Sequence, residues 1–446
     1  INGTDWKNEV TAIDRMAKLT KEDIVAFANK YLKEDNYAVI YKKQGKDPNE
    51  KKMTKPEITP IITNRDVASP FLVEVQESAV KPIEPVFLDY QKDMSQLKAK
   101  SDIPVLYKQN VANDLFQLIY VFDMGNNHDK ALGTAFDYLE YLGTSDMTPE
   151  ELKSEFYRLA CTFYVSPGNE RTYVVLSGLN ENMPAAVQLF EKLLADAQVN
   201  KEAYTNMTSD ILKARSDAKL NQGQNFSRLM SFAMYGPKSP ATNLLTEAEL
   251  TNMNPQELVD RIHNQNSYKH RILYYGPSSS KDLLATINQY HQVPAALKDI
   301  PAGNEYSYLE TPVTKVLVAP YDAKQIYMAQ ISNLDKKYDP AIEPIRALYD
   351  EYFGGGMNSI VFQEMRETRG LAYSAWASIM PPSYLKYPYV LRTQIATQND
   401  KMIDAVTTFN DIINNMPESE AAFKLAKDGL TNRLRTERII KGDIIW

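Results

Sequence analysis

The sequence contains little cysteine and no long hydrophobic run. Cys161 is the single cysteine among 446 residues, so the chain cannot form an internal disulfide and must be held together by packing. It alternates with Phe163 and Val165, a pattern that predicts a buried structural residue in a strand. The longest apolar stretches, such as Leu118 to Phe122, are far shorter than the roughly 20 residues of a membrane-spanning helix, and we expect no membrane span.

Histidine is scarce as well, with four residues: His128, His263, His270 and His291. No two of them are four residues apart, so a helical zinc site with two histidine ligands is absent, including the inverted order His-x-x-Glu-His. We therefore expect this chain to bind no metal. His263 and His270 lie at the ends of predicted elements, where solvated side chains are more common than ligands.

Several motifs of other enzyme classes are missing. The sequence has no Gly-x-Gly-x-x-Gly after a strand, no Gly-Lys-Ser/Thr loop and no Gly-x-Ser-x-Gly elbow, which argues against nucleotide enzymes and serine hydrolases. The net charge is −7 and no dense block of lysine and arginine occurs. Nucleic acid is therefore not expected as a partner, and neither is an anionic membrane surface.

The composition and the hydrophobic pattern predict a globular protein of mixed α+β class with more than one domain. Hydrophobic residues make up 43% of the chain and charged residues 24%, as in globular proteins that fold around packed cores. Hydrophobic periodicity predicts strands at 115–124, 160–165, 171–178 and 271–275, and helices at 129–142, 148–158, 181–235 with a break near Val199 and Asn200, and 254–263.

The first hundred residues follow a different pattern. Thr20 and Asp23 form the sequence signature of a capping box at the start of a helix, and Val39 to Tyr41 is expected to be a strand. Between 44 and 100 the chain has one glycine and six prolines, a composition that favours an extended, semi-rigid linker.

An internal repeat indicates the domain organisation. Asn180 to Tyr204 aligns without a gap with Asn399 to Phe423, and both stretches describe a capped helix, a break and a second helix. The stretch 20–41 resembles 254–275 as a third, partial copy. We predict tandem α+β domains, partial at both ends, with roughly 50 further residues needed to complete the last one. The expected bounds are 1–42 for the end of a preceding domain, 43–100 for the linker, 101–297 for one domain and 298–446 for the next.

One string is unusual: Gly354-Gly355-Gly356-Met357-Asn358-Ser359, followed by a helix that ends near Arg366 and by Tyr373 in or entering a strand. Three glycines permit positive φ and close backbone approach, and Asn358 or Ser359 can cap the following helix. The spacing of Arg366 and Tyr373 allows both to donate to a carbonyl or an oxyanion on one surface. Alternatively, Arg366 pairs with Glu364 or Glu367 and Tyr373 belongs to the core.

This string resembles the signature of the pitrilysin/insulinase family of zinc metallopeptidases, in which a glycine-rich loop precedes Gln-Glu-x-Arg-Glu-x-x-Gly-Leu-Ala-Tyr. The resemblance implies tandem α+β domains, each an antiparallel sheet flanked by helices, in two halves that close like a clamshell. The family holds zinc in its first domain, often just before a Gly-Thr pair. Here Gly143-Thr144 gives the matching position, but residues 134–138 (Thr-Ala-Phe-Asp-Tyr) lack both histidines. The resemblance therefore places zinc on an N-terminal half outside this sequence.

By resemblance, the chain is the noncatalytic C-terminal part of a zinc endopeptidase and is inactive alone. Arg366 and Tyr373 are then expected to bind the substrate backbone or to stabilise the tetrahedral intermediate, and Gly354, Gly355 and Gly356 to bind substrate. The expected partners are a peptide substrate and the N-terminal half of the same protein. Export to the bacterial periplasm is compatible with the resemblance, although the sequence leaves the location open. The alternatives are an inactive scaffold or partner subunit of the family, and a peptide-binding module that uses a sheet edge.

Overall fold

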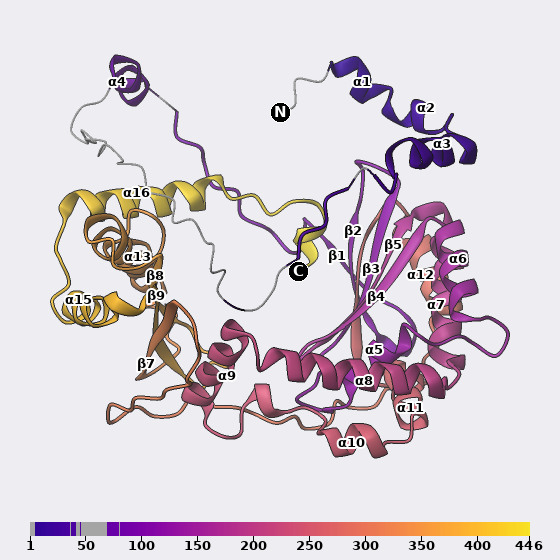
Figure 1. Cartoon of the computed structure of the whole chain (residues 1–446). Helices are drawn as coiled ribbons and strands as arrows, with labels where there is room; N and C mark the ends of the chain where they lie inside the picture. Colours follow the sequence, from indigo (N-terminus) through magenta and orange to yellow (C-terminus); the bar gives the residue numbers. More distant parts are fainter. Residues whose placement is uncertain (1–4, 36, 42–44, 46–68, 80) are drawn as a thin grey trace. The chain divides into compact units, whose positions relative to one another are not determined.

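The structure is a computed structural model that describes residues 5–35, 37–41, 45, 69–79 and 81–446 (Figure 1). The chain divides into two compact units, Ile1–Val80 and Lys81–Trp446. The first unit contains four helices in its described part, and none of the first three has a buried residue. They are α1 (Trp6–Val10), α2 (Ala12–Met16), α3 (Lys21–Tyr31) and α4 (Pro70–Glu77).

The N-terminal predictions are met in part. The capping box of Thr20 and Asp23 forms at the start of α3, as expected. The predicted strand at Val39 to Tyr41 is wrong, because these residues lie exposed and pair with no strand in the described part of the chain. The range 43–100 includes residues outside the described ones, at 43, 44, 46–68 and 80. Its described part holds α4 and the strand Ser95–Lys98, so it is not extended throughout.

The second unit contains a six-stranded sheet, and its strand order is β1-β2-β6-β3-β5-β4. The β2 and β6 strands pair in parallel, and the other neighbouring strands pair antiparallel. The strands are β1 (Ser95–Lys98), β2 (Pro104–Gln109), β3 (Leu115–Phe122), β4 (Cys161–Pro167), β5 (Thr172–Leu179) and β6 (His270–Gly276). The predicted strands at 115–124, 160–165, 171–178 and 271–275 correspond to β3, β4, β5 and β6.

Helices cover one face of this sheet, and the side chains of β3 point alternately to this face and to the opposite one. Phe116, Leu118 and Tyr120 are buried in the core under the helices, whereas Ile119 and Val121 point to the opposite face and pack with Ile445 near the C-terminus. The helices of this part of the chain are α5 (Leu132–Leu139), α6 (Pro149–Arg158), α7 (Met183–Asp196), α8 (Lys201–Ala218), α9 (Gln222–Tyr235), α10 (Glu247–Asn252), α11 (Gln256–Asn264) and α12 (Ser280–Tyr290).

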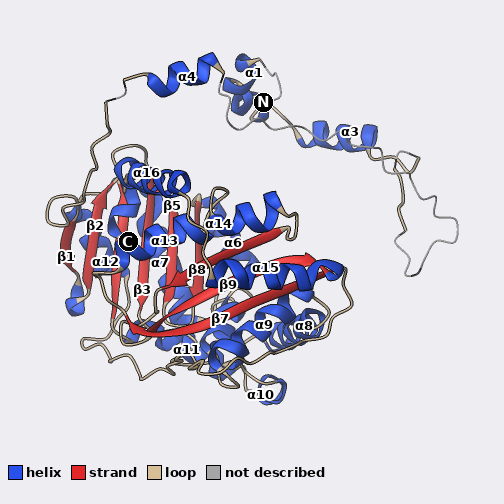
Figure 2. Ribbon diagram, turned by 90° about the vertical axis from the view of Figure 1, so that its left-hand side faces the viewer, coloured by secondary structure: helices blue, strands red, loops and turns tan. Residues whose placement is uncertain are grey.

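A second, three-stranded antiparallel sheet follows, with the order β7-β9-β8 (Figure 2). Its core contains Phe353, Ile395, Phe409 and Ile412 from both the strands and the helices. The elements are β7 (Gln325–Lys337), β8 (Ser374–Met380), β9 (Pro388–Gln398), α13 (Glu343–Tyr349), α14 (Ile360–Phe362), α15 (Met402–Asn414) and α16 (Glu420–Thr436).

The structure confirms the internal repeat. The order β3-β5-β4 in the first sheet matches β7-β9-β8 in the second. A 3₁₀ turn precedes α7 at Asn180–Asn182 and α15 at Asn399–Lys401. Asn200 and Ser419, at aligned positions, cap α8 and α16 with their side chains. The chain is therefore an α+β protein with tandem homologous domains, as predicted.

Two of the four histidines form a buried polar cluster with Glu191 of α7. The Nε2 atoms of His270 and His291 are 2.8 Å apart, and Nδ1 of His291 lies 2.7 Å from Oε1 of Glu191. The backbone N–H of Gln292 donates to the other oxygen of Glu191 at 2.9 Å. The expectation of a solvated His270 is wrong, because this residue, His291 and Glu191 are all buried.

The hydrogen-bond partners of His270 determine its tautomer. Nδ1 of His270 faces the carbonyl of Tyr268 and must donate to it, so Nε2 of a neutral His270 accepts from His291. Nδ1 of His291 faces a carboxylate that already accepts two N–H groups, from Gln292 and Asn266. The His291 ring therefore lies between the Glu191 carboxylate and Nε2 of His270, and Glu191 is its buried partner.

We predict that Glu191→Leu strongly destabilises the second unit. The substitution leaves the His291 side chain buried without its partner, and breaking a buried pair in this way costs about 3–5 kcal/mol. Urea unfolding followed by circular dichroism measures the change. The control is Glu155→Leu, which removes the exposed pair with Arg158 and should cost about 1 kcal/mol or less. Equal losses in the two variants would contradict the assigned pair.

Stability should also depend on pH through His270. Burial, and then the charge of His291, lower the pKa of His270 from 6.5 to about 4. Between these two values the unfolded chain binds the proton and the folded chain does not. The stabilisation is therefore complete above pH 6.5 and is lost as the pH falls toward 4, by roughly 3 kcal/mol in total.

The measurement is the free energy of unfolding at pH 7 and at pH 5, in the wild type and in His270→Phe. The variant should be less stable at both pH values, but its loss between them should be smaller by about 2 kcal/mol. An unchanged loss would show that His270 does not titrate in this window.

Candidate functional site

The glycine-rich loop is built against β8, and two of its three glycines are required by geometry. A Cβ atom on Gly354 would lie 1.8 Å from the carbonyl oxygen of Ala377 in β8, where no side chain fits. Gly356 has a φ of +73°, in the left-handed region that favours glycine. Gly355 is extended, and its N–H donates to the carbonyl of Asp350 at 2.6 Å. Close approach therefore explains Gly354, and backbone conformation explains Gly356.

Asp350 attaches this loop to the sheet. Its Oδ1 accepts the backbone N–H of Ile379 at 2.8 Å, and its Oδ2 accepts from the Ser378 hydroxyl at 2.9 Å and from Arg346 at 2.8 Å. Burial raises the pKa of the Asp350 carboxyl, and these donors and the charge of Arg346 oppose the rise. The loop and the strand therefore keep a fixed relative position.

The helix after the loop begins regularly and then widens into a π-helical turn. The side chain of Ser359 accepts from the N–H of Phe362, so Ser359 is the cap among the two predicted candidates. The turn covers Gln363–Thr368 and contains Arg366. From the helix cap to the next strand, this segment is two residues longer than its counterpart from Thr148 to Cys161. Such π-helical turns are frequent at functional sites.

The structure brings Arg366 and Tyr373 together on one exposed surface. Nη1 of Arg366 donates to the Tyr373 carbonyl at 3.2 Å, and the guanidinium carbon lies 5.5 Å from the centre of the Tyr373 ring. Tyr373 is 72% exposed and comes directly before β8, so its alternative assignment to the core is wrong. Arg366 also lies 3.8 Å from Glu367, one of its two proposed ion-pair partners. Exposed pairs of this kind contribute little energy, and Arg366 can exchange this partner for a ligand.

The arrangement can donate hydrogen bonds to a peptide. The Tyr373 hydroxyl has no hydrogen-bond partner among the described residues, and the guanidinium beside it carries five N–H donors, of which one binds the Tyr373 carbonyl. The strand β8 is at the edge of its sheet and, within the described part of the chain, pairs only with β9. Donors and a free strand edge therefore lie next to each other. The catalytic roles of Arg366 and Tyr373 and the substrate-binding role of Gly354–Gly356 stay predictions.

The position that corresponds to the zinc motif of the resembled family is apolar here. Residues 134–138 lie on α5, where Ala135, Phe136 and Tyr138 are buried. The Tyr138 hydroxyl donates to the carbonyl of Asn200 at 2.6 Å, which joins α5 to the start of α8. Within the described ranges, no group of three or more His, Cys, Asp or Glu side chains could hold a metal ion. The residues at this position do not fit zinc.

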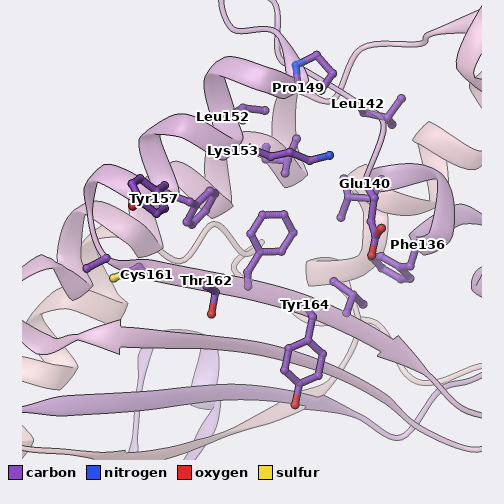
Figure 3. Close-up of a pocket in the computed structure, with 16 residues that line it drawn as sticks. Phe136, Glu140, Leu142, Pro149, Leu152, Lys153, Tyr157, Cys161, Thr162 and Tyr164 are labelled. Carbon is purple, nitrogen blue, oxygen red and sulfur yellow. The ribbon is translucent and has the colours of Figure 1, made fainter. Parts of the chain in front are cut away.

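The first sheet has a groove at the position that corresponds to the glycine-rich loop and β8 of the second sheet (Figure 3). The sequence did not reveal this groove. Its volume is about 670 Å³, and its walls come from α5, α6 and the edge strand β4. Gly143, between α5 and α6, aligns with Gly355 of the glycine-rich loop, and β4 corresponds to β8. Each domain therefore has a candidate site between an edge strand and the helix that precedes it. In the first domain this site is apolar, and in the second it is polar.

Comparison with known proteins supports the family. Residues 272–430, which include the glycine-rich loop, Arg366 and Tyr373, match the model of the Peptidase M16 inactive domain. This part of the chain is therefore similar to an M16 inactive domain. The match confirms the resemblance to the pitrilysin/insulinase family of zinc peptidases. An uncharacterized zinc protease of Rickettsia felis is 20% identical over 263 residues, which are 56% of this chain and 60% of that protein.

Solved structures share the fold. The peptidase M16 inactive domain from Pseudomonas fluorescens is 17% identical with a TM-score of 0.58, over 76% of this chain and 83% of that one. The periplasmic protease PqqL from Escherichia coli is 15% identical with a TM-score of 0.64, over 98% of this chain.

The chain spans only part of the length of the longer proteins that it resembles. It covers 46% of PqqL and 60% of the Rickettsia felis protein. None of the helices in the described ranges is long and apolar enough to cross a membrane.

We predict that Gly354→Ala disrupts the glycine-rich loop. The added methyl group would collide with the Ala377 carbonyl of β8, which belongs to the backbone and cannot turn away. The thermal unfolding midpoint should fall, and limited proteolysis should cleave near the loop. The control is Gly429→Ala in α16, where a Cβ meets nothing within 4 Å and should stabilise the helix by up to about 1 kcal/mol. Similar behaviour of the two variants would argue against the close approach.

Proposed function

We propose that this chain is the noncatalytic C-terminal part of an M16 zinc endopeptidase and that it presents Arg366 and Tyr373 to the peptide substrate. The observation that carries the proposal is the joint position of the two side chains. Both lie exposed beside the first residue of the edge strand β8, and the guanidinium contacts the tyrosine carbonyl. A peptide that lies along this edge would meet both donors.

The chemistry of the pair suits the hydrolysis of a peptide bond. As a carbonyl is attacked, negative charge develops on its oxygen, and donors that already point at this position stabilise the charge by a few kcal/mol each. The guanidinium supplies a permanent positive charge, and the phenol supplies a neutral donor. Because the guanidinium already contacts the Tyr373 carbonyl beside β8, the pair needs little reorganisation when a substrate binds.

The glycine-rich loop is proposed to let the substrate backbone come close. Gly354 already packs its Cα against β8 without a side chain between them. Gly355 and Gly356 continue the loop toward the exposed Met357, so this surface carries no bulky group before that residue. A backbone without covering side chains lets an extended peptide approach closely.

The proposal places the zinc ion on the N-terminal half of the parent protein. It rests on the unsuitable residues at 134–138 and on the zinc protease among the relatives. The proposed partners are a peptide and that half of the same protein, and this chain alone is expected to be inactive. A periplasmic location is proposed with it, because PqqL is a periplasmic protease with the same fold.

The test uses the full-length parent protein and a fluorogenic peptide. Arg366→Ala and Tyr373→Phe should each lower kcat/KM by about tenfold or more, because each removes one donor. The zinc content measured by mass spectrometry should stay the same. The matched control is Arg369→Ala, which removes a nearby exposed arginine that pairs with Glu364 and should leave turnover unchanged.

A different result would favour a scaffold. The matched family model describes an inactive domain, and this observation supports the alternative of a partner subunit without peptidase activity. Wild-type turnover in both variants would reject the roles of Arg366 and Tyr373. Absence of His-x-x-Glu-His from the N-terminal half of the parent protein would reject the enzyme itself and leave the scaffold function.

A further inference from the structure

The groove of the first domain lies along a strand edge that carries no charge. The strand β4 forms one edge of the six-stranded sheet, and among the described residues it pairs only with β5. Its sequence, Cys-Thr-Phe-Tyr-Val-Ser-Pro, has no charged side chain. The opposite edge, β1, ends in Lys98, and β7 in the second sheet contains Asp335, Lys336 and Lys337. Proteins commonly protect free edges with charges, so β4, like the uncharged edge strand β8, is open to pairing with an added strand.

The backbone of β4 offers hydrogen bonds on its free side. The carbonyl of Ala160 accepts from Leu179, and the N–H of Gly168 donates to Arg171. In this antiparallel register the residues that bond to β5 are therefore the even-numbered ones. The N–H and C=O groups of Phe163 and Val165 then face away from β5. An added strand would pair with these groups.

The side chains next to this edge are arranged to receive apolar groups. The Phe163 ring lies 4.8 Å from the ring of Phe156 in α6 and 5.0 Å from that of Phe190 in α7. In Figure 3, Thr162 and Tyr164 point away from α6, so the alternate residues of β4 face the groove. A strand added to β4 would direct every second side chain into the same groove. The volume of about 670 Å³ is sufficient for two or three such side chains.

Two unpaired charges lie on the rim of the groove. Lys153 of α6 and Glu140 at the end of α5 are exposed and make no ion pair with any residue in the described ranges. Figure 3 shows that Lys153 reaches from α6 toward the side of the groove on which Glu140 lies. A ligand with one acidic and one basic side chain beside its apolar ones would complement this rim.

We propose that the groove binds an extended peptide that adds a strand to β4, with aliphatic or aromatic side chains at alternate positions and one acidic residue facing Lys153. Main-chain hydrogen bonds supply affinity, and the groove selects the apolar side chains. The site is distinct from Arg366 and Tyr373, and it involves no bond cleavage. It goes beyond the proposed peptidase role, because a chain without that role could still use it.

The experiment measures binding of labelled peptides to this chain by fluorescence anisotropy. The probe is an eight-residue peptide that alternates leucine with threonine and carries lysine at one end and glutamate at the other. A second probe has the two charged residues exchanged. The probe that binds more tightly shows the direction in which the added strand runs. A scrambled peptide without the alternation should bind about tenfold more weakly.

Methylation of the peptide backbone tests strand addition directly. N-methyl groups on alternate amides remove the donors of one peptide edge and block its approach to β4. Two peptides are compared, one methylated at the odd-numbered amides and one at the even-numbered amides. The peptide whose methyl groups face β4 should lose about tenfold or more in affinity. The peptide whose methyl groups face solvent should bind within about threefold of the unmethylated peptide. Equal affinities of the two methylated peptides would overturn the proposal.

Variants locate the site without disturbing the core. Lys153→Glu should weaken binding of the preferred probe about fivefold, and Tyr157→Ala, at a lining residue that is 88% exposed, about threefold. The control is Lys201→Glu, an exposed lysine outside the groove, which should have no effect. Unfolding midpoints verify the fold of each variant. Unchanged affinity in both groove variants, or no binding of any probe, would overturn the proposal, and neither result depends on turnover of the full-length protein.

Discussion

Each domain of the second unit depends on the packing of one amphipathic helix across three antiparallel strands. Phe190 of α7 and Phe409 of α15 occupy equivalent positions in the repeat, and both are fully buried in their cores. A helix in this position holds β5 or β9 in the middle of the three strands. The strand that comes before it in sequence, β4 or β8, is then left at the edge. The same packing that stabilises each domain therefore determines which strand keeps an unpaired edge.

Within this common frame, the segment before the edge strand decides the chemistry. In the first domain the regular helix α6 directs Leu152 and Phe156 into the core and leaves an apolar groove beside β4. In the second domain the corresponding segment is longer and contains a π-helical turn, which brings Arg366 next to Tyr373. A change of two residues in helix length can thus convert a hydrophobic surface into one that offers donors.

Features that depend on local sequence could be predicted, and those that depend on distant contacts could not. The capping boxes of α3 and α6 follow from residues three positions apart, and the repeat follows from hydrophobic spacing. The contact of Glu191 with His291 spans 100 residues, although a carboxylate within the apolar stripe of α7 was a signal for it. The predicted strand at 39–41 failed for the same reason. A strand needs a partner, and local propensity cannot supply one.

The unpaired edges of β4 and β8 carry a risk of aggregation that a purely structural role does not explain. A free strand without charges can pair with another chain, and selection normally removes such edges. Both β4 and β8 instead limit the hazard at their ends, where Pro167 closes β4 and Pro381 and Pro382 follow β8. Proline cannot donate to a ladder, so it confines pairing to the few residues before it. The part that stays available is therefore short in both strands, which suits a peptide of a few residues better than the indefinite pairing that leads to aggregation.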